Sequence, residues 1–191
     1  MRIFPRSDKH SGFTIVELLI VIVVIAILAA ISIVAYNGIQ TRAENNKTAQ
    51  GLAAYAKALA LYAVDNGTYP STTTYPCLGN PTSNQCGRVA GSTTTCPVFT
   101  GLAVVNSTFD ADLAPYIGST KPTLSNNTLE CAGYQFRGAH VYANSTNPKI
   151  LRIKSFFKGT GDCPTVGSLT LLSRQQHDQT IYCSFAMPTL A

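Results

Sequence analysis

One carboxylate near the start of a long apolar run constrains this chain more than any other feature. Residues 13–35 form a 23-residue segment in which Glu17 is the only charged side chain. A helix of that length reaches about 34 Å, enough to cross the hydrocarbon core of a bilayer. A carboxylate inside such a segment costs about 2.5 to 3.5 kcal/mol, so we expect it to have a partner or a function. The segment offers no basic residue, so the partner is a lipid headgroup, a proton or a charge brought by another molecule.

The segment before the apolar run is short and basic. It carries three basic side chains against one acidic side chain, Arg2, Arg6 and Lys9 against Asp8. Basic flanks of a membrane helix stay on the cytoplasmic side. We therefore expect residues 1–12 to face the cytoplasm, and everything after about residue 36 to lie on the outer side of the membrane.

A basic leader that ends in Gly12, then Phe13-Thr14, then Glu17 in an unbroken apolar helix, resembles the N-terminus of type IV prepilins and pseudopilins. In that family a membrane-embedded prepilin peptidase removes the leader after the glycine and methylates the new N-terminal phenylalanine, here Phe13. The resemblance implies that Glu17 meets the free N-terminal amine of a neighbouring subunit during assembly. An amine and a carboxylate attract each other strongly in a medium of low dielectric constant, where either alone is costly.

A conventional signal peptide or a simple membrane anchor is the alternative for this segment, since both also combine a basic start with an apolar core and small residues. The apolar run is longer than the roughly 7 to 15 residues usual in the core of a signal peptide. Glu17 at its start also fits such a core poorly. The two hypotheses differ in the N-terminus of the mature chain, which is Phe13 for a prepilin.

The helical pattern continues after the apolar run, although the composition turns polar. Apolar residues, many of them alanines, recur at spacings of three and four as far as Ala63, which is typical of an amphipathic helix. We predict one helix over residues 14–64, with residues 13–35 as its transmembrane or filament-core part and residues 36–64 as its amphipathic continuation. The sequence Asp-Asn-Gly at residues 65–67 predicts its end, because glycine adopts the left-handed conformation that closes helices.

Residues 65–191 have the size of one domain and the composition of short strands joined by loops. Three segments rich in β-branched and aromatic residues predict strands, 134–143, 150–157 and 180–186. Residues 102–105 add a short element, and residues 110–117 a helical turn. The resemblance to type IV pilins implies an α+β fold, in which the long N-terminal helix packs on an antiparallel sheet of a disulfide-bonded, globular extracellular head.

All six cysteines lie in the part of the chain expected outside the membrane, Cys77, Cys86, Cys96, Cys131, Cys163 and Cys183. An even number of cysteines in an oxidising compartment, without the CxxC spacing of zinc or redox sites, indicates disulfides. The sequence alone does not choose among the pairings. Our working assignment pairs Cys163 with Cys183 and Cys77 with Cys86, which leaves Cys96 with Cys131. A bridge commonly closes the C-terminal region of related pilins, and this resemblance supports the first pair.

Four basic residues concentrate the mild positive charge of the chain beside one predicted strand, Lys149, Arg152, Lys154 and Lys158. The formal net charge is +5, or +3 without residues 1–12. A basic stripe with aromatic neighbours can contact DNA phosphates or an acidic host surface. The alternative is the solvated face of an amphipathic strand, with Phe156 and Phe157 turned at least partly to the core. Neither the three histidines nor the carboxylates form a catalytic or metal-binding pattern, so we expect no enzyme activity, no cofactor and no metal.

The leading hypothesis from the sequence is a structural subunit of a type IV pilus. Such a subunit is a single-pass protein of the cytoplasmic membrane before assembly and part of an extracellular filament afterwards. Its expected partners are other pilin subunits, the prepilin peptidase and the pilus assembly machinery, and the family implies adhesion, twitching motility or DNA uptake. The alternatives are a minor pilin or adhesin that binds DNA or a host surface, and a pseudopilin of a type II secretion system. The long head and its cysteines weigh mildly against the pseudopilin.

Overall fold

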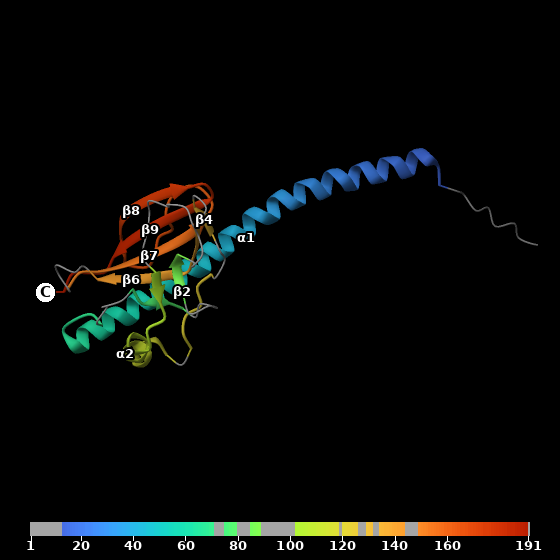
Figure 1. Cartoon of the computed structure of the whole chain (residues 1–191). Coiled ribbons are helices and arrows are strands. Elements are labelled where there is room, and N and C mark those ends of the chain that lie inside the picture. Colours follow the sequence, from blue (N-terminus) through green and yellow to red (C-terminus); the bar gives the residue numbers. More distant parts are fainter. Residues whose placement is uncertain are drawn as a thin grey trace, which may run out of the picture. The chain divides into compact units, whose positions relative to one another are not determined.

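The computed structural model of this chain describes residues 13–70, 75–79, 85–88, 102–118, 120–125, 129–131, 134–143 and 149–190. The chain divides into two compact units, Met1–Gln40 and Thr41–Ala191, and we call the second the head unit. Helix α1 (Ile15–Asn66) supplies most of the described part of the first unit and continues into the head unit (Figure 1). The prediction of one long helix is confirmed.

Helix α1 ends at the predicted glycine. Gly67 has a φ of +70°, and its N–H donates to the carbonyl of Ala63 at 2.9 Å. The side-chain amide of Asn66 donates to the carbonyl of Tyr62 at 2.9 Å. The first bond satisfies one of the last four carbonyl groups, which have no partner within the helix, and the second adds a side-chain donor to the last turn.

The head unit contains a five-stranded antiparallel sheet in the order β1-β6-β7-β9-β8. Its strands are β1 (Cys77–Leu78), β6 (Ala139–Ala143), β7 (Leu151–Lys158), β9 (Thr180–Ala186) and β8 (Thr170–His177). Strands β7 and β9 match two of the predicted strands closely. The antiparallel sheet expected from the sequence is therefore present.

A second, four-stranded antiparallel sheet has the order β3-β2-β5-β4. Its strands are β3 (Leu102–Val104), β2 (Gln85–Arg88), β5 (Tyr134–Arg137) and β4 (Leu129–Cys131), and helix α2 (Ser107–Ile117) follows β3. Asn106 caps α2 by accepting a hydrogen bond from the N–H of Phe109, so the helix starts earlier than the turn predicted at 110–117.

The prediction of one continuous strand over residues 134–143 was wrong. Gly138, with a φ of +65°, separates β5 from β6, and the two strands belong to different sheets. A left-handed residue interrupts the extended backbone, and glycine adopts that conformation at little cost. The turn at Gly138 therefore passes the chain from one sheet to the other.

Strand β8 was missed because its sequence lacks the apolar alternation of a half-buried strand. Its residues TLLSRQQH are exposed on both faces except at His177, which is partly buried. β8 is an edge strand and takes its register from β9, with a bulge between Leu171 and Ser173. Backbone pairing rather than side-chain burial makes it a strand, which ends at His177.

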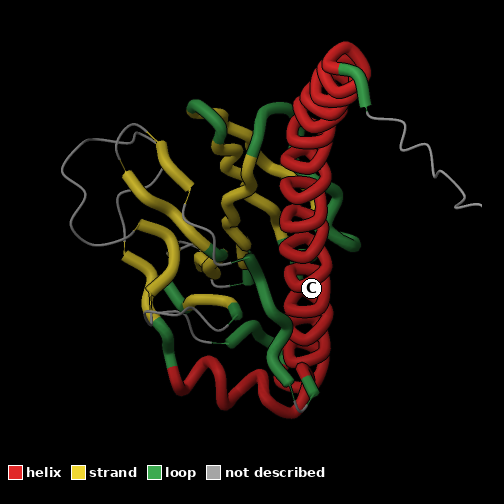
Figure 2. Tube along the Cα trace, turned by 90° about the vertical axis from the view of Figure 1, so that its right-hand side faces the viewer, coloured by secondary structure: helices red, strands yellow, loops and turns green. Residues whose placement is uncertain are grey.

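The main core lies between the second part of α1 and one face of the five-stranded sheet (Figure 2). Leu52 and Leu59 of α1 are fully buried, as is Ile153 of β7. The alanines predicted as a small-residue stripe also contribute, since Ala49, Ala56 and Ala63 belong to the same cluster. Small side chains on the helix let it approach the sheet closely.

Gly51 allows a loop to cross α1 at close range. A Cβ at this position would lie 2.5 Å from Cδ2 of Leu124 and 3.0 Å from the carbonyl oxygen of Thr123. Leu124 is itself buried in the core cluster. A glycine that costs up to about 1 kcal/mol in a helix interior is therefore explained by the side chain packed over it.

Gly51→Ala should lower the free energy of unfolding by about 1 to 3 kcal/mol, because the added methyl group must displace Leu124 or the loop backbone. Gly38→Ala is the matched control, since nothing lies within 4 Å of its Cβ position. Thermal unfolding of the oxidised, detergent-solubilised chain, followed by near-UV circular dichroism, measures both variants. An unchanged unfolding temperature for Gly51→Ala would contradict the close contact.

Candidate functional site

Helix α1 begins with a reciprocal cap formed by Thr14 and Glu17. The Thr14 N–H and hydroxyl donate to Glu17 Oε2 at 2.9 and 2.7 Å. The Glu17 N–H donates in turn to the Thr14 hydroxyl oxygen at 3.2 Å. This is a capping box, in which the two residues satisfy backbone N–H groups that the first turn of a helix leaves unpaired.

The capping box supplies, from within the same chain, part of the stabilisation that a charged Glu17 needs in an apolar segment. Two donors and the positive end of the helix dipole stabilise the carboxylate. Both donors from Thr14 reach Oε2, and Oε1 accepts no hydrogen bond from any described residue. The Thr-x-x-Glu spacing by itself predicts a capping box, so Glu17 has a partner within its own chain besides the outside partner expected from the sequence.

Phe13, the expected N-terminus of the processed chain, directly precedes this cap and is 82% exposed. Gly12, the expected cleavage position, lies outside the described residues. The large apolar side chains that follow from Ile15 to Ile33 are exposed wherever the structure describes them. By length and composition α1 can cross a membrane. The cap thus stands at the start of an uncovered apolar surface.

The four predicted basic residues do not form one exposed stripe. Lys149 and Lys158 are exposed, whereas Arg152 and Lys154 are partly buried. The Lys154 Nζ lies 4.6 Å from the centre of the Tyr142 ring, a cation–π contact. Burial lowers the pKa of Lys154, and the charge of Arg152 lowers it further.

The two phenylalanines beside these basic residues are both buried and face opposite sides of β7. Phe157 belongs to the core against α1. Phe156 points to the other face, where its ring centre lies 5.3 Å from that of Tyr182. Phe156 and Tyr182 are cross-strand partners on β7 and β9. Packed aromatic rings beside a half-buried lysine are typical of packed side chains rather than of a free binding surface.

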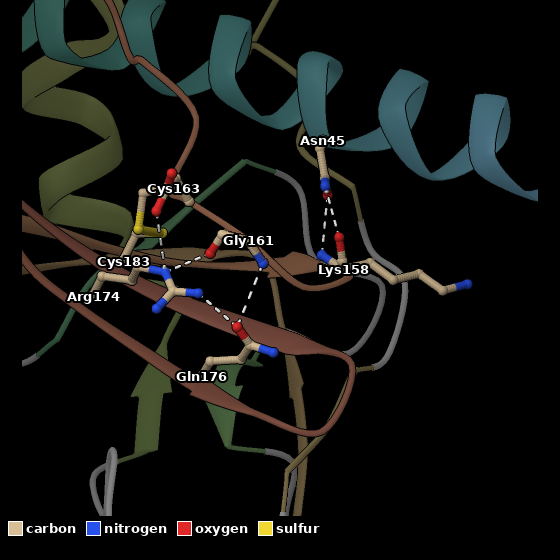
Figure 3. The surroundings of a disulfide bond; sticks show 8 residues. Asn45, Lys158, Gly161, Cys163, Arg174, Gln176 and Cys183 are labelled. Atoms are coloured by element: carbon tan, nitrogen blue, oxygen red, sulfur yellow. Dashed lines mark hydrogen bonds and ion pairs between the residues drawn. A yellow bond between two sulfur atoms is a disulfide. The ribbon is translucent and has the colours of Figure 1, made fainter.

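Two disulfides join pairs named in our working assignment, Cys77 to Cys86 and Cys163 to Cys183. The remaining pair includes Cys96, which lies outside the described residues. Cys163 follows the turn after β7 and Cys183 lies within β9, so their bond ties the loop between β7 and β8 to β9 (Figure 3).

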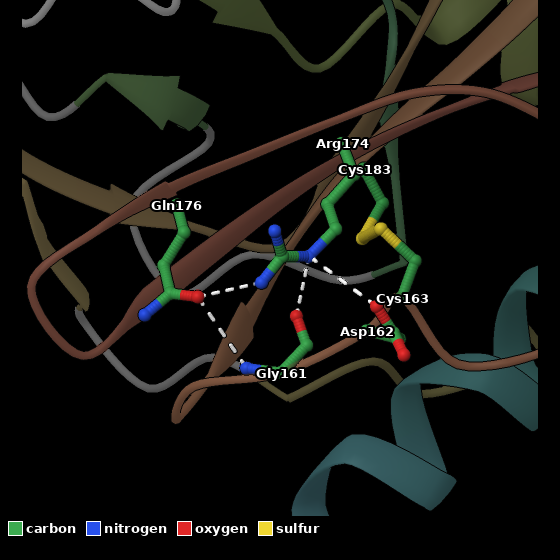
Figure 4. A network of polar contacts seen from close by, with 6 residues as sticks. All are labelled: Gly161, Asp162, Cys163, Arg174, Gln176 and Cys183. Atoms are coloured by element: carbon green, nitrogen blue, oxygen red, sulfur yellow. Dashed lines mark hydrogen bonds and ion pairs between the residues drawn. A yellow bond between two sulfur atoms is a disulfide. The ribbon is translucent and has the colours of Figure 1, made fainter.

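Hydrogen bonds hold the end of β7 and the loop that follows it. The side chain of Asn45 on α1 accepts from the Lys158 N–H at 3.0 Å and donates to the Lys158 carbonyl at 2.8 Å (Figure 3). On the sheet side, Arg174 Nε donates to the Gly161 carbonyl, and its Nη2 donates to Gln176 Oε1 at 2.6 Å (Figure 4). These contacts hold the end of β7 to α1 and the loop to β8.

His10 lies outside the described residues, whereas His140 lies in β6 and His177 ends β8. Within the described part of the chain, no three His, Cys, Asp or Glu side chains lie close enough together to hold a metal ion. His140 is fully buried beside Tyr75 and Phe156. Burial, with a smaller effect from the charge of Lys154, lowers the pKa of His140 from 6.5 to about 3.

The buried histidine should make the head unit sensitive to acid. Below pH 6.5 the unfolded chain protonates His140, whereas the folded chain does not until about pH 3. The free energy of unfolding is therefore unaffected by His140 above pH 6.5. Below that pH, down to about pH 3, His140 lowers it by about 1.4 kcal/mol per pH unit. Urea unfolding of the full chain in detergent at pH 7.5 and pH 5 measures this loss. In His140→Gln the loss should shrink, and His177→Gln is the control; an identical loss in His140→Gln would contradict the assignment.

Comparison with known proteins finds one family motif and several relatives. The prokaryotic N-terminal methylation motif matches residues 7–33. Type II secretion system core protein G of Escherichia coli (strain K12) is 36% identical over 66 residues, 35% of this chain and 46% of that protein. The core protein G of Aeromonas hydrophila is 36% identical over 67 residues, 35% of this chain and 47% of that protein. Prepilin peptidase-dependent protein D of Escherichia coli (strain K12) is 42% identical over 60 residues, 31% of this chain and 41% of that protein. No solved structure matches the chain.

The chain thus spans just under half the length of these relatives. The matched motif contains Gly12, Phe13 and Glu17, and together with the apolar helix it fits a protein anchored in the inner membrane. The long helix also packs on an antiparallel, disulfide-bonded sheet, as in a pilin. The motif, these relatives and this fold support the resemblance of the chain to the type IV pilin-like family.

Proposed function

We propose that the chain is a structural subunit of a type IV pilin-like filament, a pilus in our leading hypothesis. In this proposal a prepilin peptidase cuts after Gly12, residues 13–35 hold the subunit in the inner membrane, and assembly then moves it into the fibre. The observation that carries the proposal is the capped start of α1. It presents one carboxylate next to Phe13 on a helix whose apolar surface no described part of the chain covers.

The geometry suggests how Glu17 selects the position of the next subunit. Transfer of apolar side chains from lipid to neighbouring helices gains little hydrophobic energy, so packing and polar contacts must set the register. The capping box occupies Oε2 of Glu17. In our proposal Oε1 accepts the Phe13 amine of an incoming subunit, while Thr14 keeps the carboxylate oriented. The pairing gives the fibre a direction, because amine and carboxylate come from different copies.

A pseudopilin of a secretion filament is the second candidate, because two of the relatives above are core proteins of type II secretion systems. A minor pilin that binds DNA or a host surface has weaker support, since Arg152 and Lys154 are partly buried. Adhesion, twitching motility and DNA uptake remain expectations from the family. Disruption of the chromosomal gene separates the first two candidates: loss of surface filaments favours the pilus, and retention of secreted proteins in the periplasm favours the pseudopilin. We propose assembly, not catalysis, as the role in either case.

Glu17→Ala should give a chain that is cleaved, methylated at Phe13 and resident in the membrane, yet assembles at least about tenfold less filament, because an incoming amine loses its counter-charge. Glu17→Gln is the informative companion, since its amide oxygen can still accept from Thr14 but carries no charge. Peptide mass analysis of the N-terminus and quantification of filaments sheared from cells measure both steps.

Comparable assembly defects in both variants support charge pairing. Normal assembly of Glu17→Gln with failure of Glu17→Ala would mean that capping alone matters. Filaments from the unmodified chain that begin at a residue other than Phe13 would overturn the processing step.

A further inference from the structure

The start of the head unit is tied by a short length of chain to the segment expected in the membrane. The apolar run ends at Ala35, and the head unit begins at Thr41. Six residues of α-helix rise about 9 Å, and a fully extended chain of six residues spans only about 20 Å. At any angle between the two units, the start of the head unit therefore stays within about 20 Å of the end of the apolar run. Tyr36, which follows that run, is 67% exposed, as is typical of an aromatic residue at a membrane interface.

Two turns of the five-stranded sheet lie beside this start of the head unit. A Cβ on Gly159, in the turn after β7, would lie 3.7 Å from Cγ2 of Thr41. The backbone of Lys158 is bonded to the side chain of Asn45 (Figure 3). The Gly159 N–H donates to the carbonyl of Gln179, in the turn between β8 and β9, at 2.7 Å. We call this region the membrane-proximal end, residues 41–47, 158–162 and 176–179.

The exposed charges of the membrane-proximal end are mainly basic. Its exposed basic side chains are Arg42, Lys47 and Lys158. Among its carboxylates, Asp178 is exposed and Glu44 is partly buried. A third carboxylate, Asp162, lies 3.8 Å from the guanidinium of Arg174. Outside that ion pair, the exposed charges are thus three basic side chains and one carboxylate.

Lys158 and Arg42 are the basic residues best placed to reach a lipid headgroup. The bonds to Asn45 fix the backbone of Lys158 and leave its side chain free to extend. Figure 3 shows this side chain running away from Asn45, in the direction of the bluer, N-terminal part of the helix in view. Arg42 is the first basic residue after the apolar run. The ammonium of lysine and the planar fork of arginine both bind phosphate oxygens.

We propose that Arg42 and Lys158 contact the phosphate groups of anionic phospholipids on the outer side of the membrane, and so hold the head unit against the bilayer before assembly. The headgroup layer extends roughly 5 to 7 Å beyond each side of the hydrocarbon core, which is less than the length of chain between the two units. The inference rests on the membrane-resident subunit of the proposed function and adds a lipid surface as a partner of its head. Entry into the filament has to break these contacts, so they favour storage of the subunit.

A photo-crosslinking amino acid at Thr160 tests the contact in the oxidised, full-length chain in lipid nanodiscs. Thr160 is exposed in the turn beside Lys158. The expected product, in nanodiscs of phosphatidylcholine mixed with phosphatidylglycerol, is a phospholipid adduct that mass spectrometry detects. Nanodiscs of phosphatidylcholine alone should give less adduct, because they lack the negative surface potential that attracts basic residues. The same crosslinker at Thr170, at the other end of β8, is the control and should give little adduct in either.

Charge substitutions separate a specific contact from proximity alone. Arg42→Gln and Lys158→Gln should each reduce the adduct at position 160 about fivefold in the anionic nanodiscs, and raised salt should have the same effect. Lys149→Gln is the matched control, since Lys149 is an equally charged, exposed lysine before the other end of β7. Both tested side chains are exposed, and the bonds between Lys158 and Asn45 use only the Lys158 backbone, so the variants should keep the fold.

Three outcomes would each overturn the contact and leave the proposed function intact. These are no lipid adduct at position 160, an adduct that Arg42→Gln and Lys158→Gln leave unchanged, and an equal loss of adduct in Lys149→Gln. A chain that does not insert into the nanodiscs would instead overturn the membrane-resident subunit itself.

Discussion

The packing of α1 on the five-stranded sheet is the interaction on which the head unit depends. Leu52 and Leu59 are fully buried there, and small side chains such as Gly51 and Ala56 let the sheet and a crossing loop come close. One helix therefore has two surroundings along its length. Its second part is packed against the protein, whereas its first part exposes apolar side chains that require lipid or other copies of the chain.

Local contacts hold the end of β7 and the loop that follows it. Asn45 bonds both backbone groups of Lys158, where β7 extends beyond its pairing with β6. The bond between Cys163 and Cys183 and the guanidinium of Arg174 hold the following loop. A disulfide stabilises largely by limiting the unfolded chain, while the polar contacts orient the folded loop. Together the disulfide and the polar contacts hold this loop against β8 and β9.

Glu17 has one observed role, in capping α1, and one proposed role, in pairing with another subunit. In a single chain Glu17 completes the first turn of α1 through Thr14. In the proposed filament the same carboxylate meets an amine from another copy. In this proposal the cap stabilises the carboxylate while the subunit is in the membrane, and the pairing with the amine stabilises the assembled filament.

The sequence by itself determined the long helix, its stop at Gly67, the strands near 151–158 and 180–186, and the special position of Glu17, because each is encoded by local patterning. Only the tertiary structure decided the break at Gly138, the existence of β8 and the burial of Lys154. These depend on residues far apart in the chain: β8 is a strand because β9 pairs with it, and Lys154 is half-buried because Tyr142 and Tyr182 surround it. Periodicity reports which face of an element is apolar, but not which neighbour will cover it.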